Sequence, residues 1–175
     1  MKQFVFKQDI GFEKHLGIET ERISIIEPPV KSFHNMVKKA KGPVIILGGD
    51  EKINRLAVEN KKVSILLSPE RNDRKDSLFI RRSGLNQVLC KLAAKNNVSV
   101  GFDFSSVLKS SEKKRARIIG RMAQNVKLCR KYKVGIVVAS FASNKFELRS
   151  NDSLRSFCKV IGMDTKQIKS IFGKI

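Results

Sequence analysis

Short hydrophobic runs alternate with longer amphipathic segments along most of the chain. Runs rich in β-branched and aromatic residues predict six strands, at Phe4–Phe6, Arg22–Ile26, Val44–Leu47, Val63–Leu67, Val98–Phe104 and Val134–Ser140. Most of these runs are apolar at nearly every position, which is typical of strands buried on both faces of a parallel sheet. Such strands separated by helices predict an α/β fold, either an open doubly wound sheet or a small barrel.

Capping residues mark the ends of the predicted helices. The helices are expected at Glu51–Asn60 after Asp50, at Leu85–Asn96 with Leu85, Val88, Leu89 and Leu92 buried, from Ser110 or Ser111 to Lys133, from Ser150 to Gly162 with Leu154, Phe157 and Ile161 inward, and after the capping box Asp164–Gln167. The chain of 175 residues is long enough for one domain with a core, so we expect a single domain over residues 1–175.

Two segments lack the periodicity of a helix or strand. Ser68–Ser83 follows the fourth predicted strand, and Phe141–Ser150 follows the last. A loop as long as Ser68–Ser83 inside one domain is usually functional or disordered. Both loops follow the carboxyl ends of strands, where α/β proteins place their sites.

The charge is strongly positive and unevenly distributed. The formal net charge is +20, and residues 91–175 carry 19 Lys and Arg against 5 Asp and Glu. A surplus of this size indicates an anionic partner, with nucleic acid favoured over membrane because no apolar run approaches ~20 residues. A charged surface without a partner is the alternative. We recognise no signal peptide or lipidation motif in the sequence, and therefore expect a cytoplasmic protein, or a nuclear one in a eukaryote.

The predicted helix at residues 111–133 carries most of the candidate nucleic-acid contacts. Its hydrophobic residues Ile118, Ile119, Met122, Val126 and Cys129 fall on one side. The opposite side is predicted to be a continuous basic stripe, formed by Lys113, Lys114, Arg117, Arg121, Gln124, Lys127 and Lys131. Few acids are available to pair with it, so the stripe suits a phosphate backbone, although a solvated helix face gives the same pattern. Arg115 points toward the apolar side and could present its guanidinium at the strand-end face.

Residues for protein-based catalysis are few. His15 and His34 form no metal-ligand pattern, and Cys90, Cys129 and Cys158 are expected to be reduced core thiols. Gly48-Gly49 follows a strand and is expected to form a tight turn, with phosphate binding as the alternative. Four acids lie near strand ends, where structural ion pairing and acid–base roles both remain open: Glu27, Glu70, Asp103 and Glu147.

Several strings, in order, resemble the archaeal and eukaryotic RNase P protein component 3 family over roughly residues 43–164. They are Gly48-Gly49-Asp50-Glu51-Lys52-Ile53-Asn54-Arg55, Arg74-Lys75-Asp76, Ser83-Gly84-Leu85-Asn86, Val100-Gly101-Phe102-Asp103-Phe104-Ser105, Arg115-Ala116-Arg117 through Asn125 to Arg130-Lys131-Tyr132, Ser140-Phe141-Ala142, Glu147-Leu148-Arg149-Ser150 and Ile161-Gly162-Met163. The resemblance implies a TIM-barrel-like fold related to the PHP phosphoesterases without their metal-binding histidines. The barrel is expected to be shortened or incomplete, because the chain is shorter than typical family members and the region around Ile26–Val44 lacks a βα unit that they have.

The same resemblance implies a non-catalytic subunit of ribonuclease P, the endoribonuclease whose RNA matures the 5′ end of precursor tRNA. Such a subunit binds and stabilises the catalytic domain of the RNase P RNA. Its implied partners are that RNA, precursor tRNA through the holoenzyme, a small ferredoxin-like subunit and other RNase P proteins. No cofactor is expected in the protein, and Mg²⁺ is expected with the RNA.

Two other functions remain open from the sequence. One is a general structured-RNA or ribosome-associated binding protein, and the other is a PHP-type metal-dependent phosphoesterase. For the RNase P subunit and the general RNA-binding protein, the candidate RNA-binding residues are the same: Arg74, Lys75, Arg81, Arg82, Lys113, Lys114, Arg115, Arg117, Arg121, Lys131 and Arg149. No catalytic or metal-binding residue is predicted.

Overall fold

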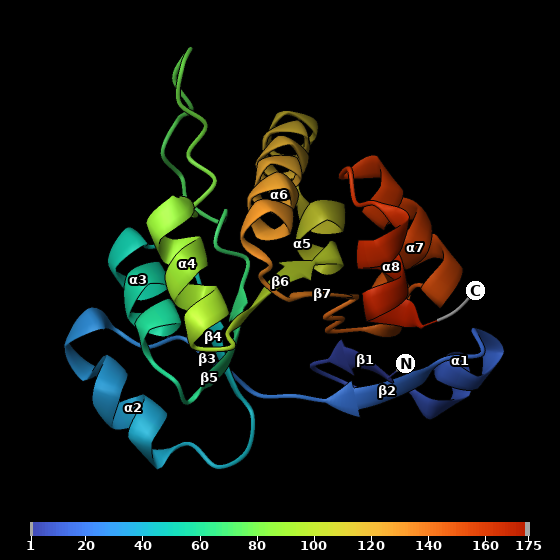
Figure 1. Ribbon diagram of the computed structural model, residues 1–175. Coiled ribbons are helices and arrows are strands. Elements are labelled where there is room, and N and C mark those ends of the chain that lie inside the picture. The colour runs from blue at the N-terminus through green and yellow to red at the C-terminus, as the bar shows by residue number, and fades with distance from the viewer. Residues whose placement is uncertain (1, 174–175) are drawn as a thin grey trace.

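The computed structural model describes residues 2–173, in which strands and helices alternate (Figure 1). The strands are β1 (Lys2–Val5), β2 (Glu19–Arg22), β3 (Ile25–Ile26), β4 (Val44–Leu47), β5 (Val63–Leu67), β6 (Ser99–Asp103) and β7 (Ile136–Ala139). The helices are α1 (Ile10–His15), α2 (Phe33–Lys39), α3 (Glu51–Glu59), α4 (Gln87–Lys95), α5 (Phe104–Lys109), α6 (Glu112–Tyr132), α7 (Asn151–Val160) and α8 (Thr165–Phe172), with 3-10 turns η1 (Val30–Ser32) and η2 (Lys145–Glu147). All six predicted strand regions are confirmed.

The strands form a short barrel. All pairings are parallel, in the orders β1-β2 and β3-β4-β5-β6-β7. The predicted strand Arg22–Ile26 divides between two partners, because β2 pairs with β1 while β3 pairs with β4. The ring continues from β7 to β1, where the Phe141 amide donates to the Phe4 carbonyl over 3.0 Å and Val5 bridges Ala142. The expectation of a TIM-barrel-like, shortened fold is confirmed.

Hydrophobic side chains pack on both surfaces of the strands, as the continuous apolar runs predict. The inner cluster fills the barrel and consists of Phe4, Phe6, Ile23, Ile25, Ile45, Leu47, Ile65, Leu67, Val137, Ala139 and Phe141. The outer cluster lies between the strands and the helices, with Ile46, Leu66, Val100 and Val138 from the strands. Helices α3 and α4 lie together on one flank, α6 packs against α4 and α5, and α7 lies beside α8 (Figure 1).

Local sequence signals explain where most helices begin. The Asp50 carboxylate accepts hydrogen bonds from the amides of Lys52 and Ile53 at 2.9 and 3.1 Å, which starts α3. Asp164 and Gln167 form the predicted capping box of α8. Ser111 rather than Ser110 precedes α6, and Lys133 ends it in a left-handed conformation.

The structure corrects one predicted strand end and one predicted helix face. Phe104 ends the predicted strand but begins α5, because the strand stops at Asp103 and the chain turns directly into a helix. Val88 is predicted to lie on the buried side of α4 but is 51% exposed, whereas Cys90 and Ala93 are buried. The helix is therefore rotated so that the small side chains face the core. Between β3 and β4 the described chain contains η1 and α2 but no further strand.

Candidate nucleic-acid interface

The loop between β5 and α4, residues 68–86, rises above the helices beside α6 (the green segment in Figure 1). We refer to residues 68–84 as the 68–84 loop. It carries four of the predicted RNA-binding residues, Arg74, Lys75, Arg81 and Arg82, all of which are exposed. The Arg81 guanidinium donates to the Gly120 carbonyl of α6 over 2.9 Å, so the loop and the helix form one surface.

Three buried polar side chains hold the 68–84 loop in place. From α3, the Asn54 amide nitrogen donates to the carbonyls of Pro69 and Gly84 at 3.2 and 3.1 Å. From α6, Asn125 donates to the Ser83 carbonyl over 2.8 Å. Asn54 and Asn125 are fully buried, so water does not compete for these hydrogen bonds. Irregular backbone of this length is thereby anchored at both ends.

Arg121, the third of these side chains, anchors the centre of the loop and corrects a prediction. The helical wheel places Arg121 on the outward, RNA-facing side of α6, but its side chain is 1% exposed. Its guanidinium donates to the carbonyls of Glu70, Asn72 and Arg74 and pairs with Asp76 at 2.8 Å. These bonds hold the pKa of Asp76 below its usual value, outweighing the partial burial that raises it. Arg121 therefore supports the loop from beneath and is removed from the candidate contacts.

The buried supports Asn54 and Asn125 were not identified from the sequence. A signal existed, because both lie on the apolar side of their helices, where a polar side chain needs a hydrogen-bond partner. Arg121 has the same helical phase, three residues after Ile118 and four before Asn125. The predicted basic stripe misses this, because it groups Arg121 with the solvent-facing lysines and arginines.

Glycines allow the loop to approach α3 closely. Gly84 has a φ of +80°, and a Cβ there would lie 1.9 Å from the Pro69 carbonyl oxygen. Gly49 has a φ of +118°, and its amide donates to the Asn54 side chain over 3.0 Å. The Gly48 amide donates to the Leu67 carbonyl. Gly48 and Gly49 thus lie in irregular backbone between β4 and α3, and their amides are used within the protein and are not available for phosphate.

The basic surface of α6 is interrupted at its middle. Lys113 and Lys114 near its start and Lys127 and Lys131 near its end are exposed, and Arg117 is half-buried. Between them the 68–84 loop covers Arg121 and contacts Gly120 and Gln124. The continuous stripe predicted from the sequence is therefore replaced by two basic ends of α6 joined by the basic side chains of the loop.

The exposed basic residues differ in their availability. Arg74 pairs with Glu51 at 2.8 Å, and Arg82 approaches the same carboxylate at 4.0 Å. Within residues 2–173, several of the other candidates on the 68–84 loop and α6 make no ion pair, among them Lys75, Arg81, Lys113, Lys114, Arg117 and Lys131. A cation without a neighbouring acid keeps its charge for an external phosphate.

Arg115 and Arg149 are predicted to face RNA, but their guanidinium groups also bind backbone carbonyls. Arg115 donates to Val107, Leu108 and Ser110 at 3.0 to 3.2 Å, and so satisfies the last carbonyls of α5. The guanidinium expected at the strand-end face is thus occupied by α5. Arg149 donates to the carbonyls of Phe146 and Leu148 and lies 5.9 Å from the Phe104 ring.

The strand-end acids divide into two kinds. Glu147 accepts from the Ser143 amide at 2.8 Å and from Lys109 at 2.9 Å; these bonds hold its pKa below the usual value despite partial burial, which raises it. It is a structural acid. Glu70 and Asp103 are different, because burial raises the pKa of Glu70 to about 8 and that of Asp103 to about 6. Glu27 is exposed.

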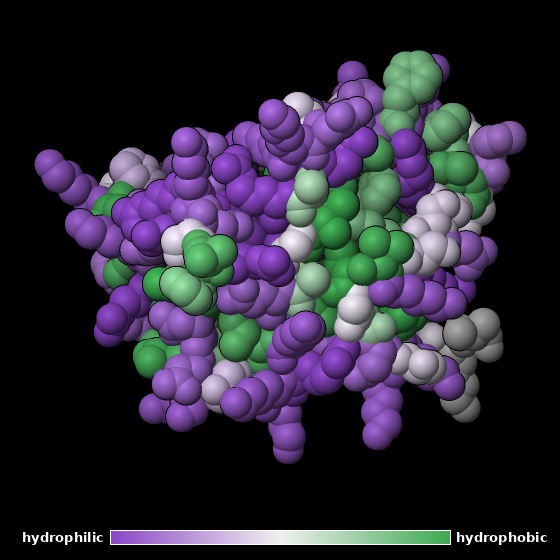
Figure 2. Space-filling view, turned by 90° about the horizontal axis from the view of Figure 1, so that it is seen from above, coloured by the Kyte–Doolittle hydropathy of each residue, from purple (hydrophilic) through white to green (hydrophobic). Residues whose placement is uncertain are grey.

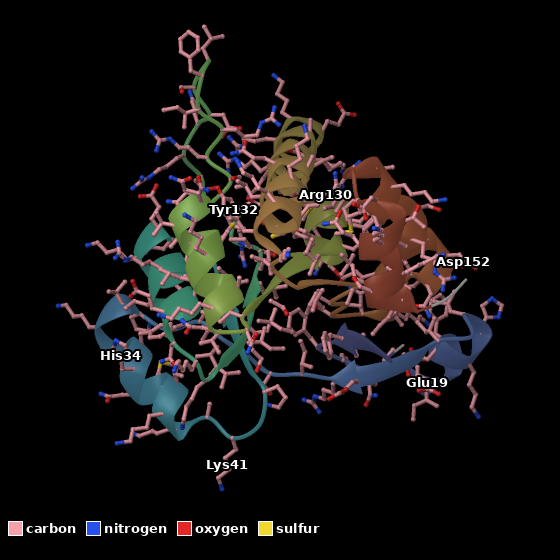
Figure 3. The ribbon with its side chains drawn as sticks, viewed as in Figure 1. Glu19, His34, Lys41, Arg130, Tyr132 and Asp152 are labelled. Atoms are coloured by element: carbon pink, nitrogen blue, oxygen red, sulfur yellow. The ribbon has the colours of Figure 1, made fainter. Side chains whose placement is uncertain are left out.

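The described residues offer little for metal-based chemistry. Among residues 2–173, no group of three or more His, Cys, Asp or Glu side chains is placed to hold a metal ion. His34 lies on α2, on the opposite flank of the molecule from Asp152 on α7 (Figure 3), and its ring packs edge-on against Phe33. Cys90, Cys129 and Cys158 are buried free thiols, as predicted.

The C-terminal end of α6 is tied to its neighbours. Arg130 pairs with Asp164 at 2.9 Å and Tyr132 contacts Gln87, so this end is joined to α8 and α4 (Figure 3).

Viewed from above, hydrophilic side chains cover most of the face, with smaller hydrophobic areas between them (Figure 2). No helix within residues 2–173 is long and apolar enough to cross a membrane.

Comparisons with known proteins agree with this arrangement. Residues 21–175 match the family model described as RNase P subunit p30. The chain is 36% identical over 157 residues to "Ribonuclease P protein component 3" of Methanosarcina acetivorans, covering 88% of this chain and 60% of that protein. It is 33% identical over 182 residues to the protein of the same name from Methanococcoides burtonii, covering 89% and 72%. The chain thus spans about 60% of the length of several curated relatives.

A solved structure supports the same relationship. The fold superposes on a chain of the "cryo-EM structure of archaeal Ribonuclease P with mature tRNA" with a TM-score of 0.72 and 26% identity, over 97% of this chain and 76% of the other. The anchored basic loop and the short barrel are therefore found in a chain that belongs to the RNase P subunit p30 family.

Proposed function

We propose that this protein is a non-catalytic RNA-binding subunit of ribonuclease P, which binds and stabilises the catalytic domain of the RNase P RNA. The observation that carries the proposal is the anchoring of the 68–84 loop by Asn54, Arg121 and Asn125 beside the basic ends of α6. The names of its relatives and its structural similarity to a chain of an archaeal ribonuclease P support the assignment to this enzyme.

The arrangement acts by holding cations where an RNA backbone can meet them. A flexible loop would lose conformational entropy on binding, and anchoring the backbone beforehand reduces that cost. Lys75 on the loop and Lys113 and Lys131 on α6 extend from supported backbone and make no ion pair within residues 2–173. Each phosphate that they neutralise releases counterions, which favours binding. Hydrolysis belongs to the RNA, together with the Mg²⁺ that it binds.

The tip of the 68–84 loop is suited to a protein partner. Leu78, Phe79 and Ile80 are 89%, 91% and 60% exposed, although the backbone below them is held by Arg121. Adjacent exposed apolar side chains on a supported loop are typical of protein contacts. The partner proposed here is the small ferredoxin-like subunit of ribonuclease P, with precursor tRNA and the other RNase P proteins reached through the holoenzyme.

Purification from native cells tests the assignment. The tagged chain should recover one structured RNA, the RNase P RNA, together with a small protein in equal amount. Phe79→Ser should lose the protein and keep the RNA, whereas Val160→Ser, which changes a similarly exposed apolar residue on α7, should keep both. Recovery of ribosomal RNA instead would favour a general RNA-binding protein.

A further inference from the structure

A cavity of about 690 Å³ opens at the carboxyl ends of the barrel strands. Its lining combines strand ends, the following loops and the start of α6: Phe6, Arg22, Ile23, Ser24, Ile25, Glu27, Leu47, Leu67, Glu70, Arg71, Asp103, Ser106, Lys109, Ser110, Ser111, Lys114, Ile118 and Phe141. The RNA-binding surface proposed above does not require this cavity, although Lys114 belongs to both.

The inner end of the cavity is apolar and partly aromatic. Phe6 and Phe141 have ring centroids 6.3 Å apart and belong to the hydrophobic cluster that fills the barrel. Leu47 and Leu67 extend the same surface. A flat, apolar ring system can pack against such a surface, and base–aromatic contacts in RNA complexes have this character.

Two carboxyl groups with incomplete hydrogen bonding line the cavity. Glu70 is 1% exposed, and neither of its carboxyl oxygens has a hydrogen-bond partner among the described residues. One carboxyl oxygen of Asp103 is likewise buried and has no hydrogen-bond partner within residues 2–173. Buried polar atoms of proteins are normally hydrogen-bonded, so these groups have capacity left for a polar ligand.

The outer end of the cavity is cationic. Arg71 and Lys114 are exposed and make no ion pair within residues 2–173, whereas Lys109 is paired with Glu147. Arg22 and the hydroxyl groups of Ser24 and Ser111 complete this end. An apolar interior, polar atoms along the wall and cations at the opening match the three parts of a nucleotide: its base, the polar edge of that base and its phosphate.

We propose that the barrel cavity binds a single nucleotide, with its base against Phe6, its polar edge at Glu70 or Asp103, and its phosphate at Arg71 and Lys114. In the assembled particle this nucleotide is an unstacked residue of the bound RNA, a step that rests on the proposed function. The cavity volume exceeds that of one nucleotide and leaves room for its sugar.

The protonation of Glu70 agrees with this ligand. The groups facing it are Asp103 from β6 and Arg121, Asn125 and Cys129 from α6. Burial raises its pKa to about 8, so near neutral pH the carboxyl is uncharged and offers one donor and one acceptor. This pair complements the Watson–Crick edge of adenine or cytosine, which presents one acceptor beside an amino group. A divalent cation would instead require ionised carboxylates.

Titration of the full-length protein with AMP, CMP, GMP and UMP, with inorganic phosphate as the reference, tests the binding directly. AMP or CMP should bind roughly 5- to 150-fold more tightly than phosphate, since stacking of one base on aromatic side chains contributes ~1–3 kcal/mol. Phosphate binding as tightly as every nucleotide would overturn the proposal, because the cavity would then recognise only an anion.

Ser24→Trp blocks the cavity mouth from an exposed position, and Ser156→Trp adds the same bulk to the exposed surface of α7. The first variant should lose nucleotide binding and the second should keep it, with equal melting temperatures showing that both are folded. Arg71→Ala with Lys114→Ala should also weaken binding, whereas Lys38→Ala with Lys91→Ala removes the same charge elsewhere and should not.

The same variants, tested with a transcript of the RNase P RNA, distinguish the sources of the nucleotide. If Ser24→Trp loses affinity for both the monophosphate and the transcript, the nucleotide comes from the RNA. If it loses only the monophosphate, the cavity serves a free nucleotide and the binding chemistry stands. If the wild type binds the transcript, no monophosphate binds and Ser24→Trp keeps full RNA affinity, the cavity proposal fails while the proposed function survives. Failure of the wild type to bind the transcript contradicts the proposed function itself.

Discussion

At the scale of single residues, one arginine connects the two segments that form the candidate interface. Arg121 is the largest fully buried side chain of the described molecule, and its guanidinium binds three backbone carbonyls and Asp76. A buried charge is tolerated when it is paired and hydrogen-bonded in this way. The geometry also requires arginine. Its planar guanidinium directs several N–H groups at the four acceptors, whereas the ammonium group of lysine is a single nitrogen that cannot reach all of them.

Replacing Arg121 should therefore damage stability, contrary to the behaviour of a surface residue. We expect Arg121→Ala to reduce the free energy of unfolding by about 3 kcal/mol, since it leaves buried acceptors without partners. Arg117→Ala, on the same helix but half-buried without an ion pair, should cost less than about 0.5 kcal/mol. Denaturant unfolding measures both, and limited proteolysis should cut the 68–84 loop faster in Arg121→Ala. Equal stabilities would contradict the anchoring role.

Glu70 predicts a specific pH dependence of stability. Its pKa is about 8 in the folded protein against a usual value of 4.5, so the folded state holds the proton more tightly. The stabilisation is complete below pH 4.5 and is lost as pH rises toward about 8, at ~1.4 kcal/mol per pH unit. Glu70→Gln should remove this slope. The free energy of unfolding of the variant should therefore rise relative to that of the wild type as pH increases from 4.5 to about 8. Parallel curves for the two proteins would show that Glu70 is ionised in the fold.

At the scale of elements, the interface depends on how a loop covers a helix. Helix α6 agrees with the predicted range almost to the residue, yet its basic side is not continuous, because the 68–84 loop lies over its middle. The exposed cations of the candidate interface are therefore drawn from both elements. Lys75 belongs to the loop, and Lys113 and Lys131 lie near the two ends of α6.

The triple variant Lys75→Ala, Lys113→Ala and Lys131→Ala should bind RNA more weakly without loss of stability. Each lost phosphate contact reduces the dependence of log affinity on log salt by about 0.7 to 0.9, so three contacts should reduce the slope by roughly two. Lys38→Ala, Lys91→Ala and Lys166→Ala, on α2, α4 and α8, remove the same charge from other surfaces. Filter binding at several salt concentrations measures both sets. Equal slopes would show that net charge alone governs binding.

At the scale of the whole molecule, a short barrel supports a strongly positive surface. The chain segment 19–26 closes the barrel by pairing with β1 through β2 and with β4 through β3. In the described chain, α2 is the one α-helix that connects β3 to β4. The net charge of +20 is then distributed over a compact body, so the individual charges add up to a strongly positive surface potential.

RNA binding by the intact protein should be steeply dependent on salt. With about six phosphate contacts, raising the salt from 50 to 200 mM should reduce affinity by on the order of 10³, with duplex DNA as the guide for scaling. The measurement is a titration of the RNase P RNA transcript at fixed Mg²⁺. A flat response would mean that charge does not drive the association.

Local patterns along the chain were sufficient to predict the strands and most of the helices. Strands such as Val44–Leu47 and Val63–Leu67 match the structure residue for residue, because their pattern reflects burial on both faces. Helix caps at Asp50, Ser150 and Asp164 depend only on neighbouring amides, so they too can be predicted locally. The net charge is a property of composition and indicated a polyanionic partner.

Which basic residues support the fold and which face outward depends on contacts between elements that are distant in the chain. Arg121 and Arg117 look alike in sequence, but the acceptors that bury Arg121 lie 45 to 51 residues earlier, in a loop without periodicity. The raised pKa of Glu70 and the barrel cavity likewise depend on residues from several strands. Helical phase describes one element at a time, whereas burial and electrostatic environment are set by contacts between elements distant in the chain.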